Sequence, residues 1–393
     1  MPEWVNWSGG QRSTPSDIAE PRTDDELADV VRRATEAGRT VRPVGSGHSF
    51  TALVPTDGVV VSLEHLAGVV SVDTAAGVAE VRAGTRIADL GDPLLAAGVA
   101  LPNQGDIDRQ AIAGACGTGT HGTGPTLPCL SAGVVGATVV LANGDIVDCD
   151  ADHHPELFAA TRLSLGATGV VARLRLRVRP AYRLHERSWT EAVADTLAAL
   201  DERIAATRHY EFFWIPGTDR CLSKSLDETE APPDPLPDER WERIDHSHRV
   251  FPSVRDDRFE EMEYAVPAEA GPECFAAIRR LYRARHPDVA WPVEYRTLAA
   301  DDVWLSPAFD RPTVTISVHQ GAGLDHDRLF RDCEAVFRHH EGRPHWGKHH
   351  RIPPDELAGL HPRWDDWWRA RDLADPDGRF LNPMLAALAA PAR

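Results

Sequence analysis

Two histidines stand inside glycine-rich stretches of this sequence: His48 in VRPVGSGHSF (41–50) and His121 in GACGTGTHGTG (114–124). Glycine lets a backbone approach a ligand closely, and successive backbone N–H groups in such a loop form a concave site for anions. Two such loops could hold the two ends of a dinucleotide, with an imidazole available for bonding to a cofactor. The alternative is that both are tight turns with incidental histidines, because glycine also marks turns.

The second glycine stretch contains the pattern GxGxxG at Gly117, Gly119 and Gly122. A Rossmann site needs a strand before this pattern and a helix directly after it. Here PTLPCLSAG follows, and Pro128 falls where the helix interior would be. Neither stretch ends in Gly-Lys-Ser/Thr, which excludes a P-loop.

A second group of polar residues lies on predicted strands. Glu294 and Arg296 are two positions apart, so their side chains share a face. A carboxylate beside a guanidinium is oriented and kept ionised, and it could bind adjacent hydroxyls of a polyol ring. In TVTISVHQ (313–320), His319 lies on a polar face and is a candidate for substrate contact or proton acceptance. Ordinary solvent exposure would explain both faces as well.

The segment RHHEGRPHWGKHH (338–350) raises a metal-dependent alternative. His345 and His349 have the i, i+4 spacing that suits zinc on a helix. Pro344 and Gly347 argue against a helix there, and the glutamate of HExxH is missing, so we expect no metal site. A third alternative is a non-catalytic protein whose glycine loops bind nothing.

The elements that must position these groups change in character near Pro180. Before it, short apolar strands alternate with helices, beginning with a helix after a capping box at Thr23–Glu26. Asn143-Gly144 between two apolar runs predicts a hairpin. Residues 181–340 are richer in Trp, Phe and charge. We therefore predict an α+β fold with a domain boundary near residue 180.

Composition limits the function classes. A chain of 393 residues favours two domains, and a net charge of −18 argues against binding nucleic acid or an anionic membrane. No apolar run is long enough for a bilayer span, and the first residues do not resemble a signal peptide. The six cysteines are scattered, which argues against disulfides and Cys-based metal sites. These features predict a cytoplasmic protein.

Together the loops resemble the FAD-binding domain of the vanillyl-alcohol-oxidase type of flavoproteins. VGSGHSF (44–50) resembles the loop whose histidine bonds covalently to the flavin, and residues 103–124 resemble the second pyrophosphate-binding stretch. SLGATGVV (164–171) is similar to the segment at the adenine end. EYRTLAADDVWLSPA (294–308) and RPHWGKHH (343–350) resemble the sugar-lactone and alditol oxidases. The resemblance covers nearly the whole chain.

The resemblance implies the site residues. His48 would hold FAD covalently, and Glu294, Arg296 and Lys348 would face the substrate, with His319 as a further candidate. The other expected cofactor contacts are Gly45, Ser46, Gly47, Ser49, Gly105, Asp106, Gly114, Thr118, Gly119, His121, Gly122 and Val171. An FAD-binding domain of residues 1–180, completed by residues 350–393, would carry a cap domain of residues 181–349 built on an antiparallel sheet.

The implied activity is oxidation of a sugar 1,4-lactone of the gulono- or arabinono-lactone type, with hydride transfer to FAD and O₂ reduced to H₂O₂. Gly105 leaves space for O₂ beside the flavin, whereas a larger residue would favour a dehydrogenase. An alditol oxidase is the alternative, although Asp106 stands where those enzymes have a serine. Cys116 suggests a second, cysteinyl flavin link, but its spacing to His121 does not match that of bicovalent relatives, so we expect a buried structural cysteine.

Overall fold

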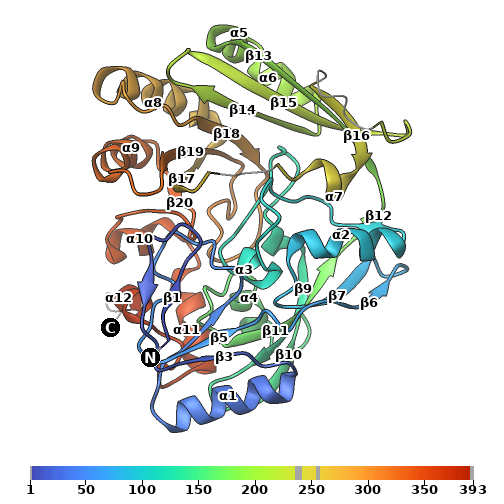
Figure 1. The fold of residues 1–393 in the computed structure, drawn as a ribbon, viewed down its shortest axis with the longest axis vertical. Helices are drawn as coiled ribbons and strands as arrows, with labels where there is room; N and C mark the ends of the chain where they lie inside the picture. Colours follow the sequence, from blue (N-terminus) through green and yellow to red (C-terminus); the bar gives the residue numbers. More distant parts are fainter. Residues whose placement is uncertain (1, 235–240, 254–256, 390–393) are drawn as a thin grey trace.

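Figure 1 shows the computed structural model, which describes residues 2–234, 241–253 and 257–389. The lower part of this view contains a three-stranded parallel sheet and a five-stranded antiparallel sheet. The upper part contains an eight-stranded antiparallel sheet with helices on its outer side. The predicted α+β fold is confirmed.

The parallel sheet supports the first glycine loop. Its strands follow the order β3-β5-β4, with bounds β3 Asp17–Ala19, β5 Val59–Ser62 and β4 Val41–Val44. Helix α1 (Asp24–Glu36) begins as predicted, because the Thr23 side chain accepts a hydrogen bond from the backbone N–H of Glu26. Strand β4 is buried and runs directly into Gly45, so the glycine loop starts from a fixed point.

The five-stranded sheet follows the order β10-β9-β11-β7-β6. The bounds are β6 Val69–Asp73, β7 Val78–Arg82, β9 Val134–Val140, β10 Ile146–Cys149 and β11 Val170–Arg177. The hairpin predicted at Asn143-Gly144 joins β9 to β10, and Gly144 has a φ of +87°. Four short helical segments complete this part: α2 Ile87–Ala96, α3 Ile112–Gly117, η1 Leu130–Gly133 and α4 Pro155–Thr161.

Two small strand pairs lie outside these sheets. Strand β1 (Trp4–Val5) pairs with β2 (Arg12–Ser13), and β8 (Val99–Ala100) pairs with β12 (Arg179–Pro180). The second pair places Pro180 at the point where the chain leaves the lower part for the eight-stranded sheet.

The eight-stranded sheet is antiparallel throughout, in the order β16-β13-β15-β14-β18-β19-β17-β20. The bounds are β13 Arg183–Ala192, β14 His209–Ile215, β15 Arg220–Thr229, β16 Glu242–His246, β17 Phe259–Pro267, β18 Val293–Leu298, β19 Thr313–Gly321 and β20 Arg343–Pro344. The helical segments of this part are α5 Val193–Ala198, α6 Leu200–Ala206, α7 Ser247–Val250, η2 Ala268–Ala270, α8 Gly271–Arg285 and α9 Asp327–His339.

The two faces of the eight-stranded sheet differ. Phe212 of β14 and Tyr295 of β18 stack at 4.8 Å between ring centroids and pack with Phe275 of α8. Glu211 and Arg296, one position further along the same strands, point to the opposite face. Both are almost fully buried, so the polar face of the sheet is turned toward the rest of the molecule rather than toward solvent.

The C-terminal helices are α10 Pro354–Leu360, α11 Trp364–Ala374 and α12 Pro383–Ala389. Helix α11 packs on α4, where the Trp367 indole donates to the carbonyl of Leu163 at 3.0 Å. The same tryptophan also belongs to the apolar core that includes Phe212 and Tyr295 of the eight-stranded sheet. The division into residues 1–180 with 350–393 and residues 181–349 stays a prediction.

Arg42 joins distant segments of the lower part. Its buried guanidinium donates to four backbone carbonyls, at 2.5–2.8 Å, from Leu53, Leu165, Gly166 and Phe380. Burial and, to a smaller extent, the neighbouring charge of Arg371 lower the pKa of Arg42 to about 9. Residues near the start and the end of the chain are therefore fastened at one point.

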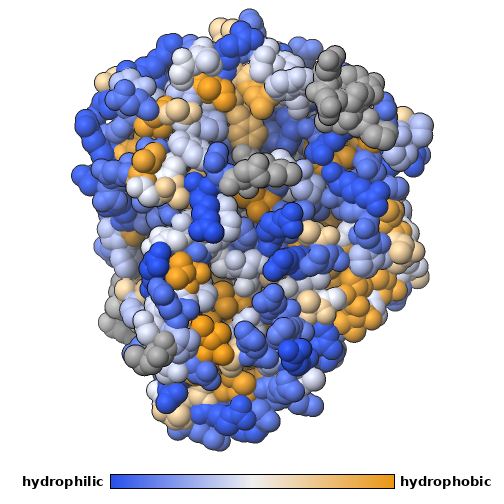
Figure 2. Space-filling model, in the orientation of Figure 1, coloured by the Kyte–Doolittle hydropathy of each residue, from blue (hydrophilic) through white to orange (hydrophobic). Residues whose placement is uncertain are grey.

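The surface seen in Figure 2 is mostly hydrophilic, with hydrophobic residues gathered mainly at its right edge. All six cysteines are free and buried. Within the described residues, no helix combines the length and the apolar character needed to cross a bilayer.

Candidate active site

A first cavity of about 850 Å³ lies between the loop after β4 and helix α3. Eight residues predicted to contact a cofactor line it: Gly45, Ser46, Gly47, His48, Ser49, Gly114, Thr118 and Val171. The two glycine stretches therefore meet at one site although they lie far apart in the sequence.

The first glycine loop has the form required to bind an anion. A Cβ at Gly45 would lie 2.5 Å from the Cβ of Ala111, so only glycine allows the loop and α3 to approach this closely. Gly47 has a φ of +67°, which other residues rarely adopt. Among the described residues, the backbone N–H groups of residues 45–49 have no hydrogen-bond acceptor. Free N–H groups in a glycine loop suit the pyrophosphate of a dinucleotide.

A second cavity of about 740 Å³ lies between the glycine loops and the polar face of the eight-stranded sheet. All four predicted catalytic residues line it: Glu294, Arg296, His319 and Lys348. They come from β18, from β19 and from the turn that follows β20. His48, Ser49 and Thr118 line both cavities, so the two meet beside His48.

Three residues predicted to contact the cofactor line the second cavity instead: Gly105, Asp106 and His121. Gly119 and Gly122 belong to neither lining among the described residues. Gly119, with a φ of +78°, backs onto Leu163. A Cβ at Gly122 would lie 2.3 Å from the carbonyl oxygen of Gln104, so this glycine permits two chain segments to touch. Cys116 is buried in helix α3, and burial raises its thiol pKa to about 12.

The solvent-exposed alternative for the two polar strand faces is wrong. Glu294 is 4 % exposed, Arg296 7 % and His319 7 %, and the ion pair between the first two is buried at 3.2 Å. Both faces belong to strands in the middle of the sheet. They are turned toward the rest of the molecule and not toward solvent. Paired charges removed from water in this way interact more strongly than surface pairs.

Two carboxylates that sequence reasoning missed complete the charge pattern. Glu261 and Glu263 of β17 line the second cavity and are 3 % and 1 % exposed. Glu261 pairs with the Lys348 ammonium. Glu263 accepts from Arg296 at 2.7 Å and from the Ser317 hydroxyl at 2.8 Å. The signal was present, because FEEMEYAVP (259–267) places both carboxylates on one strand face.

The protonation of Glu294 differs from the prediction that Arg296 keeps this carboxyl ionised. Burial raises its pKa to about 7, and nearby Asp106 and Glu211 oppose the effect of Arg296. Arg296 also lies nearer to Glu263, at 2.7 Å, than to Glu294, at 3.2 Å. The guanidinium is therefore shared, and Glu294 titrates near neutral pH.

Glu261 of the second cavity keeps its negative charge, unlike Glu294. Burial alone would raise the pKa of Glu261, but the Lys348 ammonium, the largest opposing charge, holds that pKa well below its usual range. The ring of His319 is oriented by a 2.8 Å hydrogen bond from Nδ1–H to the carbonyl of Pro292. Its Nε2, which lies 3.6 Å from Glu261, is then the nitrogen that can accept a proton.

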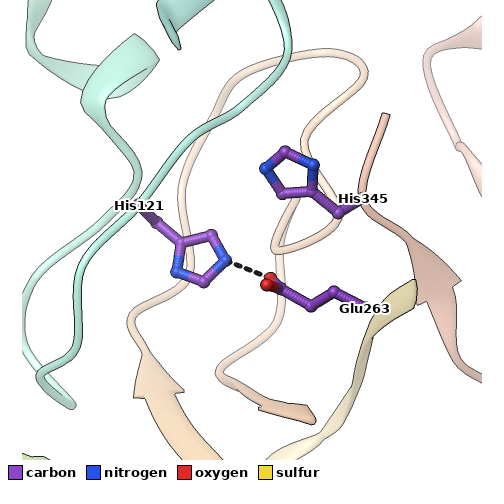
Figure 3. A group of neighbouring side chains, drawn as sticks. All are labelled: His121, Glu263 and His345. Carbon is purple, nitrogen blue, oxygen red and sulfur yellow. Dashed lines mark hydrogen bonds and ion pairs between the residues drawn. The ribbon is translucent and has the colours of Figure 1, made fainter. Parts of the chain in front are cut away.

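The spacing of His345 and His349 does not form a metal site, because residues 345–349 form a turn rather than a helix. His349 instead pairs with Glu260 at 2.6 Å. His345 points toward His121 and Glu263 in Figure 3. Its Nδ1 accepts a 3.0 Å hydrogen bond from the Gly347 N–H, which leaves the proton on Nε2. That nitrogen has no lone pair for a metal.

Glu261, Glu294 and His319 form a second group with ligand atoms close together. There, Glu261 already pairs with Lys348, and Glu294 lies 3.2 Å from the Arg296 guanidinium. We assign neither this group nor that of His345 to a metal.

The two cavities and the fold define an FAD-dependent oxidoreductase of the vanillyl-alcohol-oxidase type. An FAD-binding domain model matches residues 15–150, and a D-arabinono-1,4-lactone oxidase model matches residues 174–244 and 239–388. The chain belongs to the D-arabinono-1,4-lactone oxidase family.

Several proteins are similar over nearly their whole length. An L-gulono-1,4-lactone dehydrogenase of Mycobacterium tuberculosis is 36% identical, covering 97% of both chains. An alditol oxidase of a Streptomyces species is 30% identical, covering 98% of both. An L-gulonolactone oxidase of Bos taurus is 28% identical, covering 98% of this chain and 97% of its own. A solvent-stable cholesterol oxidase has the same fold, with a TM-score of 0.85 at 18% identity over 98% of this chain and 97% of that chain.

Proposed function

We propose that this protein oxidises a sugar 1,4-lactone with FAD and passes the electrons to O₂. One observation carries the proposal: four hydrogen-bonding groups, Glu294, Arg296, His319 and Lys348, converge on the cavity that adjoins His48. Within the described residues, Glu294 Oε1 is buried and has no hydrogen-bond partner. A buried acceptor of this kind calls for a donor, and the hydroxyl of a sugar ring is one.

FAD, when bound, supplies the acceptor for the hydride that leaves the substrate carbon. His319 Nε2 takes the proton of the reacting hydroxyl, because the bond of Nδ1–H to Pro292 leaves Nε2 basic. Arg296 and Glu294 hold neighbouring oxygens of the lactone. The Lys348 ammonium, oriented by Glu261, supplies positive charge where negative charge develops.

The cofactor is attached covalently through His48 in this proposal. Burial lowers the pKa of His48 to about 4, and the charges of Lys348 and Arg86 act in the same direction. The ring is therefore neutral at physiological pH, which is the form with a nucleophilic nitrogen. Trp7 stacks on it with 5.3 Å between ring centroids and fixes its plane. After acid precipitation the flavin should remain with wild-type protein, whereas a His48→Ala variant should release it.

Gly105 supports O₂ as the electron acceptor. It lines the second cavity, and a Cβ there would lie 3.1 Å from the carbonyl oxygen of His121. A larger side chain would have to displace this carbonyl, so the position favours glycine. The M. tuberculosis relative is named a dehydrogenase, which supports an electron acceptor other than O₂ as the alternative for this same cavity.

The test is a comparison of oxygen uptake and dye reduction by the holoenzyme with L-gulono-1,4-lactone, D-arabinono-1,4-lactone and alditols. We expect oxygen uptake and H₂O₂ with a lactone. Dye reduction without oxygen uptake would favour a dehydrogenase. Turnover of alditols alone would favour the activity named for the Streptomyces relative, and no turnover of either class would exclude the proposal.

A further inference from the structure

Glu263 joins the second glycine stretch to the eight-stranded sheet (Figure 3). Its Oε1 lies 2.6 Å from Nε2 of His121. Its Oε2 accepts from Arg296 at 2.7 Å and from Ser317 at 2.8 Å. With 1 % exposure, this carboxylate has no access to bulk water and depends on these partners. It is the one group among these that contacts both sides of the substrate cavity.

The hydrogen bonds of His121 determine its protonation. Nδ1 lies 2.8 Å from the carbonyl oxygen of Gly122, which can only accept, so Nδ1 carries a hydrogen. Nε2 faces the carboxylate of Glu263, so it carries a hydrogen as well. A ring with hydrogens on both nitrogens is an imidazolium cation.

The shared proton belongs to the imidazole rather than to the carboxyl. Oε2 of Glu263 already accepts from a guanidinium and a hydroxyl, an arrangement that favours the ionised form. Burial alone would raise the pKa of Glu263, but Arg296 and His121 outweigh it and hold that pKa well below its usual range.

We propose that Glu263 is a positioning residue that keeps His121 as an imidazolium cation and fixes Arg296 at the wall of the substrate cavity. One carboxylate then orients two cations, one from each side of the cavity. The inference rests on the proposed function only in assigning this cavity to the substrate. It adds His121 to the positive charge available where the hydroxyl loses its proton.

The other charged or titratable groups around this pair come from several segments. His345 faces it from the turn after β20, with its Nε2 protonated and its Nδ1 bonded to Gly347. Glu261 lies on the same strand but is paired with Lys348. Glu294 is paired with Arg296 on β18. None of these offers His121 a second anion at the 2.6 Å distance of Glu263.

The experiment measures the ring of His121 directly in ¹⁵N-histidine-labelled holoenzyme by NMR, with the signal assigned from a His121→Gln variant. In wild-type protein we expect hydrogens on both ring nitrogens, because each nitrogen faces a hydrogen-bond acceptor. In Glu263→Gln the ring should lose one of these hydrogens, because the neutral amide no longer supplies the negative charge beside Nε2. In that variant kcat should fall more than KM changes.

Glu260→Gln is the matched control. Glu260 is also a buried glutamate of β17 at 2.6 Å from a histidine, His349, but it does not line the substrate cavity. We expect no change in the His121 signal. A singly protonated His121 in wild-type protein at pH 8 would overturn the proposal, even if Glu263→Gln did not fold. So would a ring that stays doubly protonated at pH 9 in Glu263→Gln. Absence of lactone oxidation would affect only the proposed function, because the spectrum does not depend on turnover.

Discussion

The two cavities bind by different means. The first is lined largely by glycines and other small residues, and it includes the backbone N–H groups of the first glycine loop. The second is lined by charged side chains on sheet strands and loops, most of them paired with a partner from another element. The first therefore depends on how closely two chain segments approach, whereas the second depends on which side chains are present. Substitutions in the first cavity should therefore lower cofactor retention, and substitutions in the second should lower turnover.

Lys348→Ala should give the largest effect on the second cavity. It removes the ammonium that pairs with Glu261 and leaves a buried carboxylate without its cation. We expect kcat/KM to fall by about 10³-fold while flavin content stays at the wild-type level. Steady-state kinetics and the flavin absorbance of the same preparation measure both quantities.

The control for this variant is Lys224→Ala. Lys224 of β15 pairs with buried Glu211 on the same sheet but does not line the second cavity. It should lower stability more than turnover. If kcat/KM fell equally in the two variants, the loss of any buried ion pair on this sheet would explain the decrease. Contact of Lys348 with the substrate would then not be needed to explain it.

Gly45→Ala tests the first cavity. The added methyl group would meet the Cβ of Ala111 at 2.5 Å, and overpacking of this kind costs about 1–3 kcal/mol. We expect the fraction of protein that carries flavin to fall about tenfold, with near-normal turnover per bound flavin. Gly133→Ala is the control, because nothing lies within 4 Å of the new methyl group there. If turnover per bound flavin fell as much as flavin content, the two cavities would not differ in their effects on cofactor retention and turnover.

Glu294→Gln tests the electrostatics of the second cavity through stability. A carboxyl whose pKa is raised from 4.5 to about 7 by folding contributes stability that is present at low pH and lost as pH rises through this interval. The amide in the Glu294→Gln variant does not titrate, so the variant does not lose stability as the pH rises. The variant should therefore melt a few degrees higher than wild type at pH 8 and nearly the same at pH 4. A difference in Tm independent of pH would contradict the assigned shift.

Thr23→Ala should have the smallest effect and should touch neither cavity. Loss of the hydrogen bond from the Glu26 N–H to the Thr23 hydroxyl costs about 1 kcal/mol of stability. Flavin content and kcat should be unchanged. A loss of flavin would show that helix α1 contributes to the first cavity.

The first cavity could be recognised from the sequence because its signals are local. Gly45, Gly47 and His48 are consecutive or nearly so, and the backbone conformations they permit do not depend on distant residues. The capping box at Thr23 and the turn at Asn143-Gly144 were predictable for the same reason. Periodicity also placed Glu294 and Arg296 on one face of a strand, as the structure has them.

The sequence could not show which way that face points. A polar strand face usually meets solvent, and only the packing of the lower part against the sheet turns this one into a cavity wall. The pairing of Glu263 with His121 joins residues 142 positions apart, and no local pattern encodes it. The raised pKa of Glu294 likewise depends on Asp106 and Glu211, which come from other segments.

The hydrogen bonds of Arg42 have a consequence for biosynthesis. Arg42 is synthesised 338 residues before its acceptor at Phe380. A buried guanidinium that lacks one of its four acceptors is less stable, so the interior around Arg42 is complete only after that residue has been made. Because Arg42 also lines the first cavity, cofactor loading should follow translation of Phe380 rather than accompany synthesis of the FAD-binding segment.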